Sequence, residues 1–301
     1  MADSSSVNMD KVYCKPDAWG GMGAFARVPI AAGEVIEKGI VRVLPLDGND
    51  CPFVFTWSEG EPRQWASGSG ASVFYNMAED PNTDMKRDFK NNSFEIVANR
   101  DIAADEELTH VYISATWRKC FTDLKPIAET AYIKKNPKGH KDLPAPSKPP
   151  AALPEGPVPG TVDMSKVYVK PDAWGGHGAF AKQAIKKGDL IERGIVRVLP
   201  VDGNESPFVF TWSEGEPRKW ASGSGASVFY NMSEDPNTHM TRYFDEERFE
   251  IHAARDIEKD EELTHVYISA TWRKCFEDLK PMAEAYLKKQ EAAQGGGCSI
   301  L

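Results

Sequence analysis

Three short stretches of the sequence hold residues that could bind a ligand and carry out chemistry. The first is WGGMGAF, in which Gly21 and Gly23 flank Met22. Glycine permits positive φ and lets a ligand approach the bare backbone. A glycine-rich hairpin without a ligand would look the same. The stretch is not a nucleotide-binding fingerprint, because no helix pattern follows it.

The second stretch is ASVFYNMAEDPNT, in which an apolar run stops at Asn76. We expect a strand that ends there, with an amide that satisfies freed backbone groups or faces a ligand. The third stretch is DEELTHVYISATW, which places Tyr112 at the end of a predicted strand and Trp117 at the start of a predicted helix. A tyrosine at a strand end is by itself typical of a core residue.

Each stretch occurs twice. Asn76 and Asn231 lie 155 positions apart, and the same offset relates Tyr112 to Tyr267. Such a long period predicts two domains and not a solenoid. We expect a first domain over 1–135, a proline-rich linker over 136–162, a second domain over 163–290 and a flexible tail over 291–301.

Short strands dominate the pattern of each copy, because Val, Ile, Phe and Tyr recur between Gly, Pro, Asp and Asn. The strands expected in the first copy cover 12–16, 24–30, 34–45, 52–57, 72–76, 94–102 and 107–112. A helical arm is predicted over 117–132, with Pro126 interrupting it and starting a second short helix. The fold class is therefore mostly β with a short helical arm.

Composition narrows the class of protein. Apolar residues make up 41% of the 301 residues and charged residues 27%, which is typical of a globular protein. No apolar run is long enough to span a membrane. The net charge of −9 disfavours nucleic acid and is compatible with a basic protein substrate. The N-terminal stretch lacks a signal-peptide core, so we expect a cytoplasmic or nuclear protein.

Five cysteines without CxxC spacing predict neither a disulfide framework nor a metal site. The tail QGGGCSIL places Cys298 fourth from the end, which resembles a prenylation signal. One lipid anchors only weakly, so partial membrane association is expected if Cys298 is modified. A tail that holds an unmodified cysteine is the alternative.

Together, the three stretches resemble the SET domain of protein lysine methyltransferases, especially the small form of a chlorella virus. The resemblance covers 11–121 and 166–276. It matches the family's GxG hairpin with Gly21-Met22-Gly23, and its N-H-S-x-x-P-N motif with the seven residues from Asn76 to Asn82. The E-E-(L/I)-T-x-x-Y motif is matched by the residues from Glu106 to Tyr112. In the family, the Asn segment passes beneath the strand that leads to the tyrosine.

The resemblance implies an S-adenosylmethionine-dependent protein-lysine N-methyltransferase, with a lysine-containing basic protein such as a histone tail as substrate. It also implies a catalytic tyrosine in each copy, Tyr112 and Tyr267. The implied cofactor-binding residues are Gly21, Met22, Gly23, Asn76, Met77 and Trp117 in the first copy, and Gly176, His177, Gly178, Asn231, Met232 and Trp272 in the second. Phe74, Tyr75, Phe229 and Tyr230 are expected in the walls of the substrate channel.

Two departures leave an alternative open. Met77 and Met232 stand where the family has His, and Ile113 and Ile268 stand where it commonly has Gly. A SET fold that has lost transfer activity and binds a partner is therefore the second hypothesis. Because viral-type members of the family form two-fold dimers, we also expect the two copies to dock as an intramolecular pseudo-dimer.

Overall fold

The computed structural model describes residues 5–58, 60–135, 151–152 and 160–293. Each copy contains a four-stranded and a five-stranded sheet, so the expected mostly-β fold is confirmed. The proline-rich part of the linker and Cys298 lie outside the described residues. Within the described part of the chain, no helix is long and apolar enough to cross a membrane.

The strands of the first copy are β1 (Val12–Pro16), β2 (Met22–Ala26), β3 (Val35–Leu44), β4 (Phe55–Thr56), β5 (Trp65–Gly68), β6 (Asn76–Met77), β7 (Thr83–Asp88), β8 (Ser93–Ala98) and β9 (Glu107–His110). Those of the second copy are β10 (Val167–Pro171), β11 (His177–Ala181), β12 (Leu190–Leu199), β13 (Phe210–Thr211), β14 (Trp220–Gly223), β15 (Asn231–Met232), β16 (Thr238–Tyr243), β17 (Arg248–Ala253) and β18 (Glu262–His265). The α-helices are α1 (Lys125–Lys135) and α2 (Lys280–Ala293), and α2 extends three residues past the boundary expected at residue 290.

The sheet orders show why distant motifs meet. In the first copy the four-stranded sheet runs β1-β2-β9-β6, so β9 lies between the glycine hairpin and Asn76. β2 pairs with β9 antiparallel, whereas β6 pairs with β9 in parallel and places Asn76 opposite Thr109. The five-stranded sheet runs β4-β5-β3-β8-β7. The second copy repeats both orders.

The expected strand that ends at Asn76 is wrong. The run before Asn76 is a turn in the first copy and a 3₁₀ turn, Ser227–Phe229, in the second. Asn76 instead begins the two-residue strand β6. The apolar residues of this run are therefore buried by a turn and not by the alternation of a strand, and propensity alone does not separate the two cases.

The helical arm differs in the same way. Two 3₁₀ segments, Ile113–Thr116 and Lys119–Leu124, precede α1. Phe121 leaves helical geometry with φ of −120°, so the apolar spacing from Trp117 onward does not follow one axis. Pro126 lies in the first turn of α1, where its missing N–H costs no hydrogen bond.

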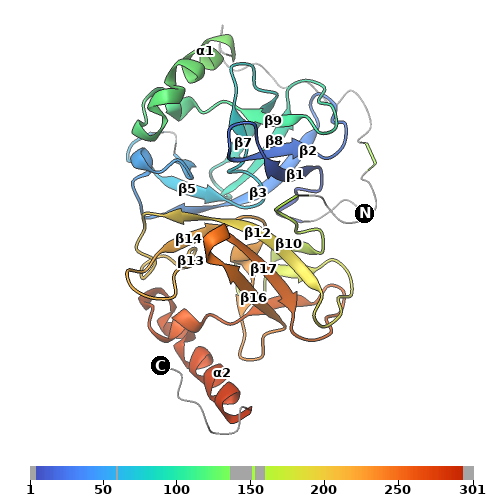
Figure 1. Cartoon of the computed structure of the whole chain (residues 1–301), viewed down its shortest axis with the longest axis vertical. Coiled ribbons are helices and arrows are strands. Elements are labelled where there is room, and N and C mark those ends of the chain that lie inside the picture. The colour runs from blue at the N-terminus through green and yellow to red at the C-terminus, as the bar shows by residue number, and fades with distance from the viewer. Residues whose placement is uncertain (1–4, 59, 136–150, 153–159, 294–301) are drawn as a thin grey trace.

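The two copies pack against each other through their five-stranded sheets, with β3 and β5 of one facing β12 and β14 of the other (Figure 1). Gly70 and Gly225 donate to each other's carbonyl oxygens at 3.0 Å, and the hydroxyls of Ser67 and Ser222 lie 3.1 Å apart. An apolar cluster is shared across this contact by Leu44, Cys51, Val54, Trp65, Leu199, Val201, Val209 and Trp220.

Segments at the start of each copy reach the other copy reciprocally. The amide of Ser6 donates to the carbonyl of Val169 at 2.7 Å, and that of Thr161 donates to Cys14 at 2.9 Å. These hydrogen bonds cover the edge strands β1 and β10 of the two four-stranded sheets. The oligomeric state of the chain in solution stays a prediction.

A buried glutamate supports the turn at the contact between copies in each half. Glu37 accepts from the amide of Ala71 at 2.7 Å and from the hydroxyl of Tyr75 at 2.8 Å, and Glu192 makes the equivalent bonds. Burial raises the pKa of both carboxyls from 4.5 to about 8, against the opposite effect of these hydrogen bonds.

Replacing Gly70 by Ala should destabilise the protein by about 1–3 kcal/mol. Gly70 has φ of +68°, and a Cβ would lie 2.2 Å from a carboxyl oxygen of Glu37. The measurement is urea unfolding. Gly20→Ala is the matched control, because Gly20 has φ of +84° but a Cβ added there would have no atom within 4 Å. An equal loss in both variants would mean that the approach to Glu37 costs nothing.

The buried glutamates should make stability depend on pH. Between about pH 4.5 and pH 8 these two carboxyls hold protons in the folded state that they lose in the unfolded state, so their contribution to the free energy of unfolding falls as pH rises and levels off above about pH 8. His110 and His265, whose pKa is lowered to about 4, oppose this fall below about pH 6.5. Glu37→Gln combined with Glu192→Gln should flatten this fall in urea unfolding at pH 5 and pH 8. Glu95→Gln, at a more exposed carboxylate, should leave it unchanged; a persistent fall in the double variant would contradict the assignment.

Candidate functional site

The glycine hairpin is tied to Asn76 by a carboxylate. Asp17 accepts from the amides of Trp19 and Gly21, each at 2.8 Å, and its other oxygen accepts from the side-chain amide of Asn76 at 2.9 Å. Burial acts to raise the pKa of Asp17, but the hydrogen bonds from Gly21 and Asn76 outweigh it and hold the pKa below its ordinary value. Asp17 is therefore an anion that orients both motifs.

The same amide connects the hairpin with β9. Asn76 also donates to Glu107 at 2.8 Å, while its own side-chain oxygen accepts no hydrogen bond from the described residues. Gly23 faces this pair: a Cβ there would lie 2.8 Å from Glu107 and 3.3 Å from the Asn76 amide. A side chain at position 23 would thus displace the cluster. Gly178, Asn231 and Glu262 repeat this arrangement.

A second asparagine holds β9 in place. Asn82 is 1% exposed and donates to the carbonyl of Glu107 at 2.8 Å, while its side-chain oxygen accepts from the amide of Thr109 at 2.8 Å. Thr83 adds a hydrogen bond to the carbonyl of Thr109 at 2.8 Å. The turn after Asn76 is therefore fixed to the strand that leads to Tyr112.

The predicted catalytic tyrosines are anchored by their hydroxyls. Tyr112 donates to the carbonyl of Tyr75, and Tyr267 donates to that of Tyr230 at 2.5 Å. Burial raises the pKa of Tyr112 above its ordinary value and that of Tyr267 to about 12. Both hydroxyls stay protonated near neutral pH, so they can donate or orient but do not serve as bases.

The C-terminal arm packs against the tyrosine. Met77 and Tyr112 contact a small cluster formed by Ala115, Phe121 and Ala128, and the ring of Tyr112 lies 5.4 Å from that of Phe121. The arm thus brings together two predicted site residues, Met77 and Tyr112. Met232 and Tyr267 pack in the same way in the second copy.

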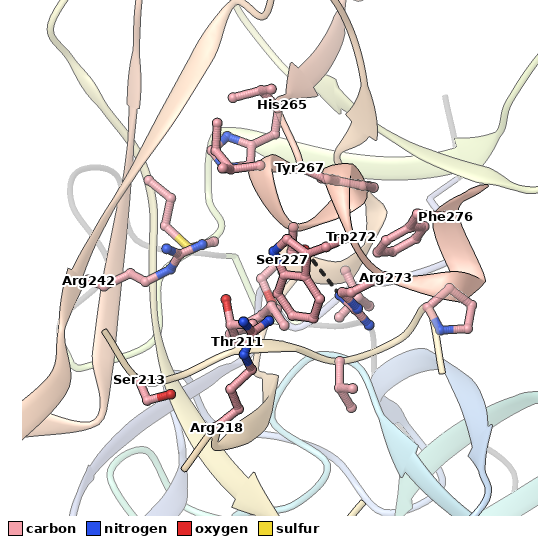
Figure 2. Close-up of a pocket in the computed structure, with 18 of the residues that line it drawn as sticks. Thr211, Ser213, Arg218, Ser227, Arg242, His265, Tyr267, Trp272, Arg273 and Phe276 are labelled. Carbon is pink, nitrogen blue, oxygen red and sulfur yellow. Dashed lines mark hydrogen bonds between the residues drawn. The ribbon is translucent and has the colours of Figure 1, made fainter. Parts of the chain in front are cut away.

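Tyr267 lines a cavity of about 440 Å³, which is a volume typical of a ligand site. Figure 2 shows Tyr267 and His265 above it, Arg242 and Arg273 on opposite sides, and Arg218 below. The predicted cofactor residues Gly176, His177, Gly178, Asn231 and Met232 are not among those that line it. Tyr267 therefore lines the cavity, whereas the residues of the glycine–asparagine cluster (Gly178, Asn231 and Glu262) do not.

Trp272 lines the cavity and carries a cation on its face. The guanidinium of Arg218 lies 3.6 Å from the ring centroid and pairs with Glu216 at 2.6 Å. In the first copy Arg63 lies 3.7 Å above Trp117. Trp272 thus lies beside the cavity, and both tryptophans, predicted as cofactor-binding residues, are already stacked against an arginine.

The predicted channel residues do not all face the cavity. Phe74 and Phe229 are each 1% exposed and lie in the core, so we place them there and not in a channel wall. Tyr75 is 2% exposed and its hydroxyl is bound to Glu37. Tyr230 lines the cavity, and its carbonyl holds Tyr267. The turn before Asn76 points the aromatic side chains inward, whereas a strand would have alternated them.

Across the contact between copies, an arginine of each copy approaches the other copy's site. The guanidinium of Arg42 lies 4.9 Å from the ring of Phe229, and Arg197 lies 5.1 Å from Phe74. Arg42 also contributes, after burial, to the lowered pKa of His177. Sequence reasoning missed both arginines because their partners lie in the other copy, 187 residues away for Arg42 and 123 for Arg197, and each repeat unit reads as independent.

The sequence reasoning also missed Arg242 and His265 in the cavity wall. A signal was present: the lining residues have the same identity 155 positions earlier, including Arg87 and His110. That identity becomes informative only once the cavity shows which positions share a wall.

A model of the SET domain family matches residues 21–113 and again residues 176–268. These matches cover more than half of the chain, and the protein therefore belongs to the SET domain family. Among solved structures, it is similar to a Plasmodium falciparum protein assigned as a histone methyltransferase. The identity is 25% over 34% of this chain and 92% of that chain, with a TM-score of 0.29. No curated protein matches the chain.

Asn82→Ala should destabilise the fold by about 2–4 kcal/mol, since it leaves the amide of Thr109 and the carbonyl of Glu107 buried without their partner. Urea unfolding measures the loss. Asn91→Ala, at an exposed residue that bonds only Asp88, should cost well under 1 kcal/mol. Similar losses in the two variants would show that Asn82 does not hold β9.

Proposed function

We propose that the protein is an S-adenosylmethionine-dependent protein-lysine N-methyltransferase with one site in each copy. The observation that carries the proposal is the placement of Tyr267, which lines a cavity of about 440 Å³ and whose hydroxyl donates to the carbonyl of Tyr230, the residue before Asn231. Membership of the SET domain family, whose members are generally lysine methyltransferases, supports this reaction.

The residues around Asn76 fit the proposed cofactor. The glycine hairpin offers backbone without side chains, and the free oxygen of the Asn76 amide can accept from an ammonium group. The carboxylates of Asp17 and Glu107, which hold that amide, also make the cluster favourable for a cation. When bound, S-adenosylmethionine would supply an activated methyl group on a positive sulfur.

The tyrosine acts through position. Its hydroxyl is held by a backbone carbonyl and stays protonated, so it orients groups that meet at the boundary between cluster and cavity. The burial that raises the tyrosine pKa would also favour the neutral form of a lysine amine, the form that can be methylated. In both copies a backbone carbonyl holds the tyrosine hydroxyl, which supports two sites.

The charge of the chain and the contacts between its two copies support the proposed partners. The net charge of −9 supports a basic, lysine-containing protein substrate. The contacts between the copies support a monomeric chain in which each copy serves as the other's dimer partner. A cytoplasmic or nuclear protein, held partly at membranes if Cys298 is prenylated, remains part of the proposal.

Tyr112→Phe combined with Tyr267→Phe should lower methyl transfer by at least about a hundredfold, because an orienting hydroxyl is lost from each site. Transfer of a labelled methyl group from S-adenosylmethionine to a pool of lysine-containing peptides measures it. Calorimetry should show cofactor affinity within a few fold of the parent protein.

Tyr13→Phe combined with Tyr168→Phe is the matched control. The hydroxyl of Tyr13 bonds Asp105 and that of Tyr168 bonds Asp260, in the turns before β9 and β18. Activity should therefore be retained. Full activity in the Tyr112 and Tyr267 double variant would overturn the assigned role. Absence of cofactor binding in the parent protein would instead favour a SET fold that only binds a partner.

A further inference from the structure

The cavity in the second copy contains more cationic than anionic groups. Arg218, Arg242 and Arg273 line it, together with Glu214 and Glu216. Arg218 is paired with Glu216, and Arg273 donates to the carbonyls of Gly203 and Ser206. Arg242 is the lining guanidinium for which the described residues provide neither an ion pair nor a hydrogen bond. Figure 2 shows it reaching into the cavity from one side.

Arg242 is exposed to solvent, and surrounding atoms still lower the pKa of its guanidinium. A guanidinium held in a pocket without a counter-ion is stabilised by an anionic ligand, and its planar fork suits carboxylate or phosphate.

The wall also contains two neutral polar side chains. The Oγ of Ser227 and the Nδ1 of His265 are buried and have no hydrogen-bond partner among the described residues. Burial, followed by the charge of Arg242, lowers the pKa of His265 to about 4, so its ring is neutral near pH 7. The equivalent atoms of Ser72 and His110 are unpartnered in the first copy as well.

The strand that carries the arginine differs between the copies in an informative way. Asp84, Lys86 and Asp88 of β7 are replaced at the equivalent positions of β16 by His239, Thr241 and Tyr243. The alternate positions, including Met85 and Arg87, are identical to Met240 and Arg242. Arg87 and Arg242 are both exposed, so neither is needed to fill an apolar core.

We propose that this cavity receives an acidic side chain of the substrate, a carboxylate or a phosphorylated hydroxyl, close in sequence to the lysine that reaches Tyr267. The inference deepens the proposed function and rests on it for the lysine. Arg242 would bind the anion, with Ser227 and His265 within the same wall. Arg87 would do so in the first copy.

This local charge refines what the net charge of −9 implies. The acidic chain as a whole attracts a basic protein, whereas a second cation placed beside Arg242 would be repelled. A substrate that is basic overall but has an acidic residue beside its target lysine satisfies both constraints. The cavity, at about 440 Å³, has room for more than one side chain.

Binding of matched peptides to the full chain, without cofactor, tests the proposal. Fluorescent peptides with one central lysine would carry Glu, Gln, Ser or phosphoserine one or two residues away. We expect the Glu and phosphoserine peptides to bind about tenfold tighter than the Gln and Ser peptides, because a charge-assisted hydrogen bond is gained. Inorganic phosphate should compete at millimolar concentration if the anion alone is recognised.

Arg87→Met combined with Arg242→Met should remove the preference while keeping the apolar stem. The corresponding double Lys variant should restore part of it, and thermal unfolding checks that each variant folds. Lys86→Ala with Lys259→Ala is the matched control, since it removes two exposed cations outside the cavity lining and should keep the preference.

Equal binding of the Glu and Gln peptides would overturn the inference, as would a preference that survives in the double Met variant. These results are independent of the reaction. Methyl transfer without an acidic preference would refute the subsite alone, whereas an acidic preference without methyl transfer would refute the proposed reaction and leave the anion site standing.

Discussion

The hydrogen bonds between Asn82 and β9 are the constraint on which the rest of each copy depends. A two-residue strand such as β6 has too few backbone hydrogen bonds to fix its own register. The buried side chain of Asn82 bonds the carbonyl of Glu107 and the amide of Thr109, and so holds the turn after Asn76 against β9. The hairpin, Asn76 and Tyr112 meet because this connection is made.

The second constraint is the contact between the copies. Gly70 and Gly225 approach closely enough to exchange backbone hydrogen bonds, and the buried carboxyls of Glu37 and Glu192 support the turns that follow them. The tyrosines bonded to these carboxyls, Tyr75 and Tyr230, provide the carbonyls that hold the hydroxyls of Tyr112 and Tyr267. The contact between copies is thereby linked to the site through a single turn.

Charge divides the site into two environments. On one side of Tyr267, the Asn231 amide is held by the carboxylates of Asp172 and Glu262 and favours a cation. On the other side, Arg242 projects into a cavity where the described residues leave it without a counter-ion. A tyrosine hydroxyl that stays protonated between such environments can orient two different ligands without itself exchanging a proton.

The sequence by itself determined the duplication, the mostly-β class and the three motifs, because offset identity and residue spacing are local properties. It predicted Tyr112, Asn76 and Gly23 as site residues, and the structure brings them around β9. Only the tertiary structure decided that the run before Asn76 is a turn that buries Phe74, since an apolar run reads alike as strand or core turn. Arg242 was beyond sequence reasoning, because the partners of a side chain depend on which strands face one cavity, and no local spacing encodes that.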